Sequence, residues 1–446
     1  MSSDLRGWSR RTALLTLAAG GGGAILAACG EAGGPAAGGA QGTPGAGAKA
    51  AEIHVNFRQG SDAEWQQRLI PQFEAKNPNI KVILDVLPAE PEYWAKVQAL
   101  YATGQVGDMI WASLGNYKNF ADKGLLGNLD PIISRDKYDL KDYAPVSLET
   151  MRWQGKLFGM PWGAHTGNPA VIYNADLLAA EGIKIEDAVK SYDSLYEAAV
   201  KLTKGPAGSR TQFGLAPGSA QIAMNNHIRA YGGDFYDAKG EKLTLDQAPA
   251  QDAIKWIQKM WRDTAPTFGT GYNADELFAN GRIAMNQTGW TGQFVPGDAQ
   301  IAGKFKWDIA QMPKGPKGIV GTQLTINGIT MSSITKQQDA TWTYIKYMMD
   351  PEAQVQIVLN NGGRPAPRAA VLKNPELLSK LKAPNVYVPL YDSALGWPEP
   401  ANHRWPEFDS AVNQVFGPIW TGAVSLEAGM REVNSKLQEI LSKPKA

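Results

Sequence analysis

The segment from residue 53 to residue 113 constrains the fold more than any other part of the chain. Apolar residues alternate in "IHVNF" (53–57) and in "IKVILDVLP" (80–88), which is typical of strands, and Trp65 and Phe73 lie between them at helical spacing. A strand, a helix and a strand in this order form a βαβ unit, which favours a parallel sheet with helices on its faces. We therefore expect an α/β fold.

This pattern continues along the chain and then starts again. A helix is expected near residues 92–102 and a strand at "DMIWAS" (108–113). A hairpin at 151–163 leads to "AVIYNADLLAAEGI" (170–183), which predicts a strand followed by a helix. The body that begins near Glu52 is long enough for two domains by the usual size range. We expect two α/β units, the second starting near its own first strand.

The first 51 residues predict targeting and not fold. The pair Arg10-Arg11 precedes a short apolar region (13–28) that ends at Cys29, the only cysteine of 446 residues. The paired arginines resemble a twin-arginine export signal, and "LAAC" (26–29) is similar to a bacterial lipoprotein box, in which the cysteine is acylated and becomes the new N-terminus. We therefore expect residues 1–28 to be a signal peptide of this type and Cys29 to carry a lipid. An ordinary thiol in an uncleaved tail is the alternative.

Residues 29–51 are mostly Gly, Ala and Pro, and we expect a flexible tether, because they offer too few bulky apolar side chains to offset the entropy of ordering. With a single cysteine, no intramolecular disulfide can form. The formal net charge of +1 comes from 44 basic and 43 acidic residues mixed along the chain, which indicates no nucleic-acid partner. The lipid anchor is the only membrane contact that the sequence predicts.

Nine short segments occur in an order that resembles the family 1 extracellular solute-binding proteins of ABC importers, the maltose-binding-protein-like group. They are "FEAKNPNIKV" (73–82), "GDMI" (107–110), "GKLFGMPWG" (155–163), "VIYNADLLAAEGI" (171–183), "YGGDF" (231–235), "LFANGRIAMNQTGW" (277–290), "MPKGPKG" (312–318), "ATWTYIKYMMDPEAQ" (340–354) and "GGRPAPR" (362–368). The resemblance covers nearly the whole chain, and the order of the segments carries it more than any single one.

The resemblance implies a two-lobed periplasmic-binding-protein-like fold of type II, with a doubly wound sheet in each lobe. It implies three crossings between the lobes, near 164–170, 313–326 and 361–369. On this basis lobe 1 comprises 52–166 and 320–364, and lobe 2 comprises 167–319 and 365–446. Ligands of open α/β sheets bind beyond the carboxyl ends of the strands, so two facing lobes predict one cleft between them.

The function that the resemblance implies is capture of a carbohydrate outside the cytoplasm and its delivery to the membrane permease of an ABC importer. The protein is expected to be a lipid-anchored monomer on the outer side of the bacterial cell membrane. Neither an enzymatic activity nor a cofactor or metal ion is implied. Arg58, Arg364 and Arg404 leave a phosphorylated or acidic sugar open as the ligand.

Fourteen tryptophans suit a sugar site, because the apolar face of a sugar packs on an indole while its hydroxyls make hydrogen bonds. Tryptophans in helical apolar stripes belong to a core, whereas those at strand ends or in loops rich in Gly and Pro can line a cleft. Adding the polar residues that follow strands, we expect ligand contacts from Arg58, Gln59, Trp111, Ser113, Asn116, Trp162, His165, Trp290, Thr291, Asn327, Trp397 and Arg404. The resemblance implies that Trp290 is the stacking aromatic.

A secreted glycosidase or lyase is the alternative function. It needs a pair of carboxylates, and Asp62 with Glu64 or Asp234 with Asp237 could supply one. The chain has no G-x-S-x-G elbow, no P-loop and no H-E-x-x-H motif, and its four histidines are scattered. The sequence therefore favours a binding protein over an enzyme.

Overall fold

A computed structural model describes most of the chain from Ala50 to Ala446. The residues outside the description are 1–49, Pro91, Thr166, Asn168, Ser219, 270–272, 289–300, Ala302, 362–363, Ala394 and 397–398. The expected signal peptide, most of the expected tether and Cys29, which is expected to carry a lipid, lie in residues 1–49. They stay predictions.

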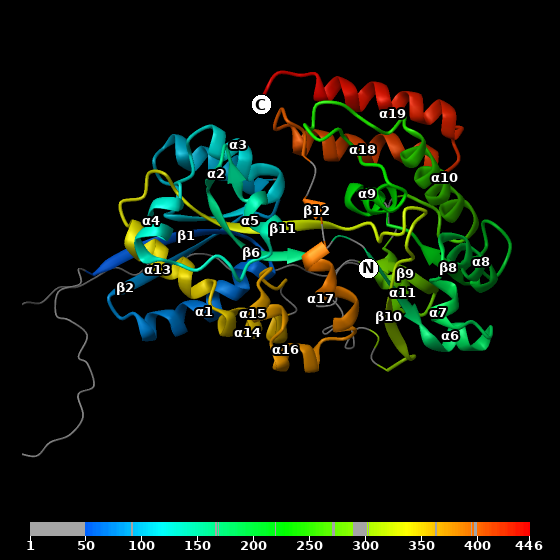
Figure 1. Ribbon diagram of the computed structural model, residues 1–446, viewed down its shortest axis with the longest axis horizontal. Coiled ribbons are helices and arrows are strands. Elements are labelled where there is room, and N and C mark those ends of the chain that lie inside the picture. The colour runs from blue at the N-terminus through cyan, green and yellow to red at the C-terminus, as the bar shows by residue number, and fades with distance from the viewer. Residues whose placement is uncertain are drawn as a thin grey trace, which may run out of the picture. The chain divides into compact units, whose positions relative to one another are not determined.

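The elements of the described residues divide between two sheets, each flanked by helices (Figure 1). The first run of the chain contains β1 (Ala51–Arg58), α1 (Ser61–Lys76), β2 (Ile80–Leu87), α2 (Glu92–Ala102), β3 (Met109–Ser113), α3 (Leu114–Asp122), α4 (Asp130–Asp136), α5 (Pro145–Thr150), β4 (Arg152–Trp153), β5 (Lys156–Leu157) and β6 (Gly159–His165). The second run contains β7 (Ala170–Asn174), α6 (Ala175–Ala180), α7 (Ile185–Ala188), α8 (Tyr192–Leu202), β8 (Phe213–Ala216), α9 (Gln221–Ala230), α10 (Ala248–Asp263), α11 (Ala274–Ala279), β9 (Ile283–Thr288) and β10 (Trp307–Gln311).

The rest of the chain returns first to one sheet and then to the other. It contains β11 (Gln323–Met331), α13 (Gln338–Met348), α14 (Pro351–Asn361), α15 (Ala369–Leu372), α16 (Pro375–Lys380), α17 (Pro384–Ser393), β12 (Leu395–Gly396), α18 (Trp405–Trp420) and α19 (Leu426–Leu441). The strands and helices expected between residues 53 and 113 are present, and the predicted α/β fold is confirmed.

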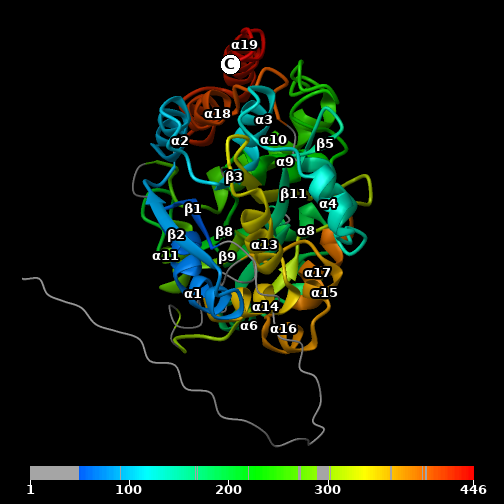
Figure 2. The same ribbon diagram turned by 90° about the vertical axis from the view of Figure 1, so that its left-hand side faces the viewer.

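The first sheet has the order β12-β11-β3-β1-β2, and β6 also pairs with β11. Strand β1 is parallel to both β2 and β3, so the carboxyl ends of these three strands meet at one edge of the sheet. Strand β11 is antiparallel to β3, and this register places Asn327 opposite Ser113. Helices α1 and α14 lie below β1 in Figure 2, as they do in Figure 1. The sheet is mixed, because β11, from the last part of the chain, is antiparallel to β3 and β6.

The second sheet has the order β10-β7-β9-β8, with only β8 and β9 parallel. Its helices bury a core of their own, which includes Leu195, Ile254 and Phe416, whereas the first core includes Phe57, Trp111 and Tyr344. We use first lobe and second lobe for the elements packed on each core. Both cores contain large, fully buried aromatic side chains, which stabilise the two lobes in the absence of any disulfide.

Three connections cross between the sheets, and the third differs from the expectation. Residues 166–169 join β6 to β7 and residues 312–322 join β10 to β11, close to the expected positions. Residues 365–396, expected in lobe 2, pack mainly on the first core through Val371, Leu377 and Tyr391, and β12 pairs with β11. The chain therefore leaves the first lobe after Gly396. Helices α15 and α16 bury apolar side chains in the first core, and the "GGRPAPR" turn alone did not predict this burial.

A methyl group at Gly321, in the second crossing, is expected to lower the free energy of unfolding by about 2 kcal/mol. A Cβ atom there would lie 1.6 Å from the backbone oxygen of Asn226 in α9, so the crossing or the helix would have to shift. Urea unfolding of Gly321→Ala checks this. Gly269→Ala is the matched control, because its Cβ would meet nothing within 4 Å. Equal stability of the two variants would contradict the packing described here.

Candidate ligand-binding site

A cavity of about 600 Å³ lies where the carboxyl ends of β1, β2 and β3 face the second lobe. Its walls come from both lobes, as the expected cleft requires. The lining residues are Arg58, Glu90, Trp94, Ser113, Gly115, Asn116, Thr325, Asn327 and Arg364 from the first lobe, and Ala220, Gln221, Ile222, Trp405, Pro406, Asp409 and Ser410 from the second.

The first-lobe wall is a connected network around Glu90. Arg58 Nη1 donates a hydrogen bond of 3.0 Å to Glu90 Oε2, while Trp94 Nε1 and Ser113 Oγ both donate to Glu90 Oε1, at 2.6 and 3.0 Å. Arg58 Nε also donates to Asp62 at 2.9 Å. Charge-assisted hydrogen bonds of this kind hold side chains in fixed positions. The wall is therefore organised before any ligand arrives.

The second-lobe wall consists of the amino-terminal ends of α9 and α18. Gln221 begins α9, is 1% exposed, and neither of its side-chain amide atoms has a hydrogen-bond partner among the described residues. Thr325 Oγ1, on the first-lobe wall, is also buried and has no hydrogen-bond partner among the described residues. Buried polar groups are nearly always hydrogen-bonded in folded proteins. These unpaired groups beside a cavity are available to hydrogen-bond a polar ligand.

The two walls meet at Gly115 and Trp405. A Cβ atom at Gly115 would lie 1.9 Å from Cδ1 of the Trp405 indole, so only glycine allows the amino end of α3 to approach α18 this closely. The indoles of Trp94 and Trp405 both line the cavity. The site thus combines aromatic faces with polar groups, the combination expected of a sugar site.

Four of the residues expected to contact ligand come together in this cavity: Arg58, Ser113, Asn116 and Asn327. The parallel strands bring Arg58 and Ser113 to the same edge, and the antiparallel register of β11 adds Asn327. Asn116 lies in the first turn of α3, where its side-chain amide donates to Ser113 Oγ at 3.4 Å.

The structure differs from the expectation at Trp111 and Trp162. Both side chains are buried in the first core, Trp111 beneath the Arg58 guanidinium at 4.2 Å and Trp162 against Phe57. They point into the core because the pleat of a strand turns alternate side chains to opposite faces, so a position at a strand end does not fix its direction.

The other expected contacts lie apart from the cavity or outside the description. Gln59 is exposed, and Arg404 is paired with Glu407 at 3.2 Å. Trp290, Thr291, Trp397 and the side chain of His165 lie outside the described residues. Contact of ligand with each of these residues stays a prediction.

Sequence reasoning missed several lining residues, chiefly Glu90, Trp94, Gln221, Trp405 and Asp409. One signal was available: "RWPEF" (404–408) places an aromatic residue and a proline at the start of a helix, since proline favours the first helical turn. The others are recognisable only once the two lobes are assembled.

The family of bacterial extracellular solute-binding proteins matches residues 68–385, more than half of the chain. The chain belongs to this family. A binding protein of Brucella abortus (strain 2308) is 23% identical to this solute-binding protein, over 83% of this chain and 88% of the relative. An ABC transporter-binding protein of Deinococcus radiodurans is 24% identical over 60% of this chain and 65% of the relative.

Solved structures with the same two-lobed fold include three sugar- or polyol-associated proteins. The sugar-binding protein MalE of Xanthomonas citri superposes with a TM-score of 0.74 at 21% identity, covering 88% of this chain and 97% of that one. An ABC substrate-binding protein of Listeria monocytogenes in complex with cycloalternan has a TM-score of 0.71 at 21% identity, covering 88% and 99%. A solute-binding protein of Agrobacterium radiobacter K84 in complex with ribitol has a TM-score of 0.72 at 18% identity, covering 88% and 99%. At these identities the likeness shows the fold.

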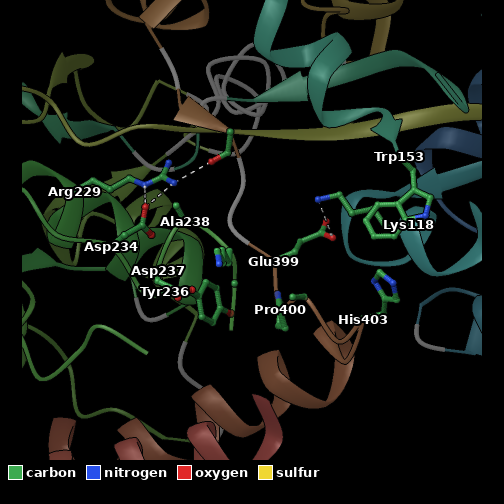
Figure 3. A pocket seen from close by; sticks show the side chains of 14 residues that line it. Lys118, Trp153, Arg229, Asp234, Tyr236, Asp237, Ala238, Glu399, Pro400 and His403 are labelled. Atoms are coloured by element: carbon green, nitrogen blue, oxygen red, sulfur yellow. Dashed lines mark hydrogen bonds and ion pairs between the residues drawn. The ribbon is translucent and has the colours of Figure 1, made fainter. Parts of the chain in front are cut away.

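A second cavity, of about 620 Å³, lies at the third crossing of this solute-binding protein (Figure 3). Lys118 and Trp153 of the first lobe face Glu399, Pro400 and His403 of the crossing. None of the described residues that were expected to contact ligand lines it. Figure 3 shows Glu399 directed toward Lys118, whose Nζ lies 3.7 Å from the carboxylate.

Glu399 is the most perturbed carboxyl group of this second cavity. Its side chain is 5% exposed, and burial raises its pKa to about 7, although the charge of Lys118 acts in the opposite direction. Oε1 of Glu399 has no hydrogen-bond partner among the described residues. Burial also lowers the pKa of His403. The third crossing therefore holds two ionisable groups that are poorly solvated.

Two further observations concern metal binding and membrane-spanning helices in the described part of the chain. Among them, no group of three or more His, Cys, Asp and Glu side chains is placed to hold a metal ion. No helix in the described part of the chain is both long and apolar enough to cross a membrane.

Proposed function

We propose that this protein captures a sugar or polyol between its lobes and delivers it to the permease of an ABC importer. The cavity at the carboxyl ends of β1, β2 and β3 carries the proposal, because both lobes line it and it combines the indoles of Trp94 and Trp405 with polar groups that lack partners. The sugar- and polyol-bound relatives with this fold support the choice of ligand class.

Closure of the lobes accompanies capture in this proposal. A ligand shifts the equilibrium between open and closed forms only through contacts that the open form lacks, so the decisive residues come from both walls. Three short crossings can confine the movement to a few residues. We take the two lobes as the rigid bodies and residues 166–169, 312–322 and the segment after Gly396 as the hinges.

The alternative function is that of a carbohydrate-active enzyme. The carboxylates proposed as its catalytic pair give it little support. Asp62 is paired with Arg58 at 2.9 Å and Asp234 with Arg229 at 3.0 Å. Asp237 accepts hydrogen bonds from the backbone amides of Glu241 and Lys242, as a turn residue does. These carboxylates have structural partners, which favours a binding role.

A thermal-shift screen with neutral sugars, amino sugars, acidic sugars and polyols is the direct test. A ligand that binds the native state at a hundredfold excess over its Kd is expected to stabilise it by about 2.7 kcal/mol, visible as a higher melting temperature. Chromatography of the same mixtures should recover the added compound unchanged. Sustained release of smaller products by the pure protein would establish the enzyme instead.

We further propose that Cys29 is acylated and that residues 29–51 tether a single copy of the body to the outer face of the cell membrane. The lipoprotein-box resemblance of "LAAC" and the paired arginines support this. Mass spectrometry of the native N-terminus should find a diacyl- or triacylglyceryl cysteine. An N-terminus at Met1 in most molecules would refute the anchor and leave the binding function untouched.

A further inference from the structure

The charges on the first-lobe wall balance one another. Arg58 is paired with Asp62 and with Glu90, which leaves little of its charge for a ligand. Burial lowers the pKa of the other guanidinium, Arg364, while the carboxylates of Asp62 and Glu90 favour its charged form. Two cations thus face two carboxylates, so the side-chain charges around this wall sum to zero, although only Arg58 forms direct ion pairs with them among the described residues.

The second-lobe wall carries a single charged side chain, Asp409. Burial alone accounts for the raised pKa of this carboxyl group, with no contribution from a neighbouring cation. Its carboxylate accepts no hydrogen bond from the described residues. No lysine or arginine of residues 50–446 lies outside the description, so none is hidden that could pair with it. Asp409, at the wall of a cavity, is therefore an acceptor that has no donor among the described residues.

Neutral groups complete the site. The amide of Gln221 and the hydroxyl of Thr325, both unpaired, can each donate and accept hydrogen bonds. Helices α3, α9 and α18 begin at the cavity, and their first-turn amides carry partial positive charge that attracts acceptor oxygens. A hydroxyl satisfies all of these groups, because its oxygen accepts and its hydrogen donates. A carboxylate or phosphate would satisfy the helix ends but confront Asp409.

We propose that Asp409 determines the charge specificity of the cavity: it binds a hydroxyl or ammonium donor of the ligand and selects against anionic sugars. This inference rests on the proposed function and addresses the question that Arg58, Arg364 and Arg404 left open in the sequence. The ligand is a neutral or amino-bearing sugar or polyol, and a uronate or sugar phosphate is discriminated against.

The test compares matched compounds by calorimetry and thermal shift: glucose, maltose and mannitol, then glucosamine, and then glucuronate and glucose 6-phosphate. The native protein is expected to bind neutral or amino members at least about tenfold more tightly than their anionic counterparts, a difference of about 1.4 kcal/mol. In Asp409→Asn the ratio should fall below about threefold. Glu407→Gln is the matched control, since Glu407 lies on the same helix but pairs with Arg404 and Lys443 and does not line the cavity.

A pH profile separates a specificity role from a structural one. An Asp with a raised pKa gains protons at a higher pH than a sugar carboxylate of ordinary pKa does, so the ratio of neutral to anionic affinities of the native protein should fall as the pH is lowered. Melting temperatures of the empty variants show whether Asp409→Asn folds, and Asp409→Ser is the second variant. An anionic sugar that binds the native protein as tightly as its neutral counterpart, or a ratio unchanged in both variants, overturns the inference. Binding of no compound in any class overturns the proposed function itself.

Discussion

Replacing Glu399 by glutamine is expected to raise the free energy of unfolding by about 3 kcal/mol at pH 8 and to change it little at pH 4. The carboxyl group has a pKa of about 7 in the folded protein, against 4.5 in an unperturbed side chain, because it is buried at the third crossing. Below pH 4.5 it is protonated in both states and contributes nothing to the pH dependence. Between these two values the folded protein retains a proton that the unfolded chain has released, so the stability of the native protein falls as the pH rises.

Glutamine has the shape of the protonated form and removes this dependence. The difference between variant and native protein should therefore grow from about pH 4.5 and level off above about pH 7. Chemical unfolding at a series of pH values measures it. Lys118, 26% exposed, can still reach solvent after the change. Glu197→Gln, on an exposed position of α8, is the control, and parallel curves for Glu399→Gln and the native protein would show that Glu399 is ionised without penalty.

Truncating Trp405 to alanine is expected to weaken ligand binding more than a hundredfold, about 3 kcal/mol, the scale of an aromatic hot spot. The indole lines the cavity and also closes it against Gly115 of the first lobe. Its loss removes both a stacking surface and the contact between the walls. The ligand from the screen above serves as the probe, and calorimetry gives the affinity.

Trp153→Ala is the matched control, because Trp153 lines the second cavity and not the first. It should leave the affinity within about threefold of the native value. If Trp153→Ala abolishes binding and Trp405→Ala does not, the ligand occupies the cavity at the third crossing. The melting temperature of each empty variant separates lost binding from lost folding.

Local patterns were sufficient to predict much of the fold. The helix expected near residues 92–102 is α2 (Glu92–Ala102), and the strand expected at 108–113 is β3 (Met109–Ser113), because alternation and helical spacing depend on neighbouring residues. The return of residues 365–396 to the first lobe was not predictable in this way. It depends on where Val371 and Tyr391 find apolar partners, which lie far away in the chain.

The residues of the candidate site also differ in whether local sequence patterns could predict them. Arg58 and Ser113 could be predicted because polar residues that follow parallel strands meet at one edge of a sheet. Gln221 and Asp409 could not, because they lie on helices of the second lobe and face the cavity only through the packing of one lobe against the other. Asp409 in particular is one of many acidic residues at helical spacing, and only its place at the cavity wall distinguishes it.

The position of β11 has a consequence for biosynthesis. In the folded protein β11 lies between β3 and β6, yet it follows every strand of the second sheet in the chain. At a synthesis rate of roughly 5–20 residues per second, β6 leaves the ribosome on the order of ten seconds before β11 is made. During that interval the edges of β3 and β6 have no partner strand, and unpaired edges are templates for aggregation. These two edges are therefore where we expect a holdase chaperone to bind the nascent chain.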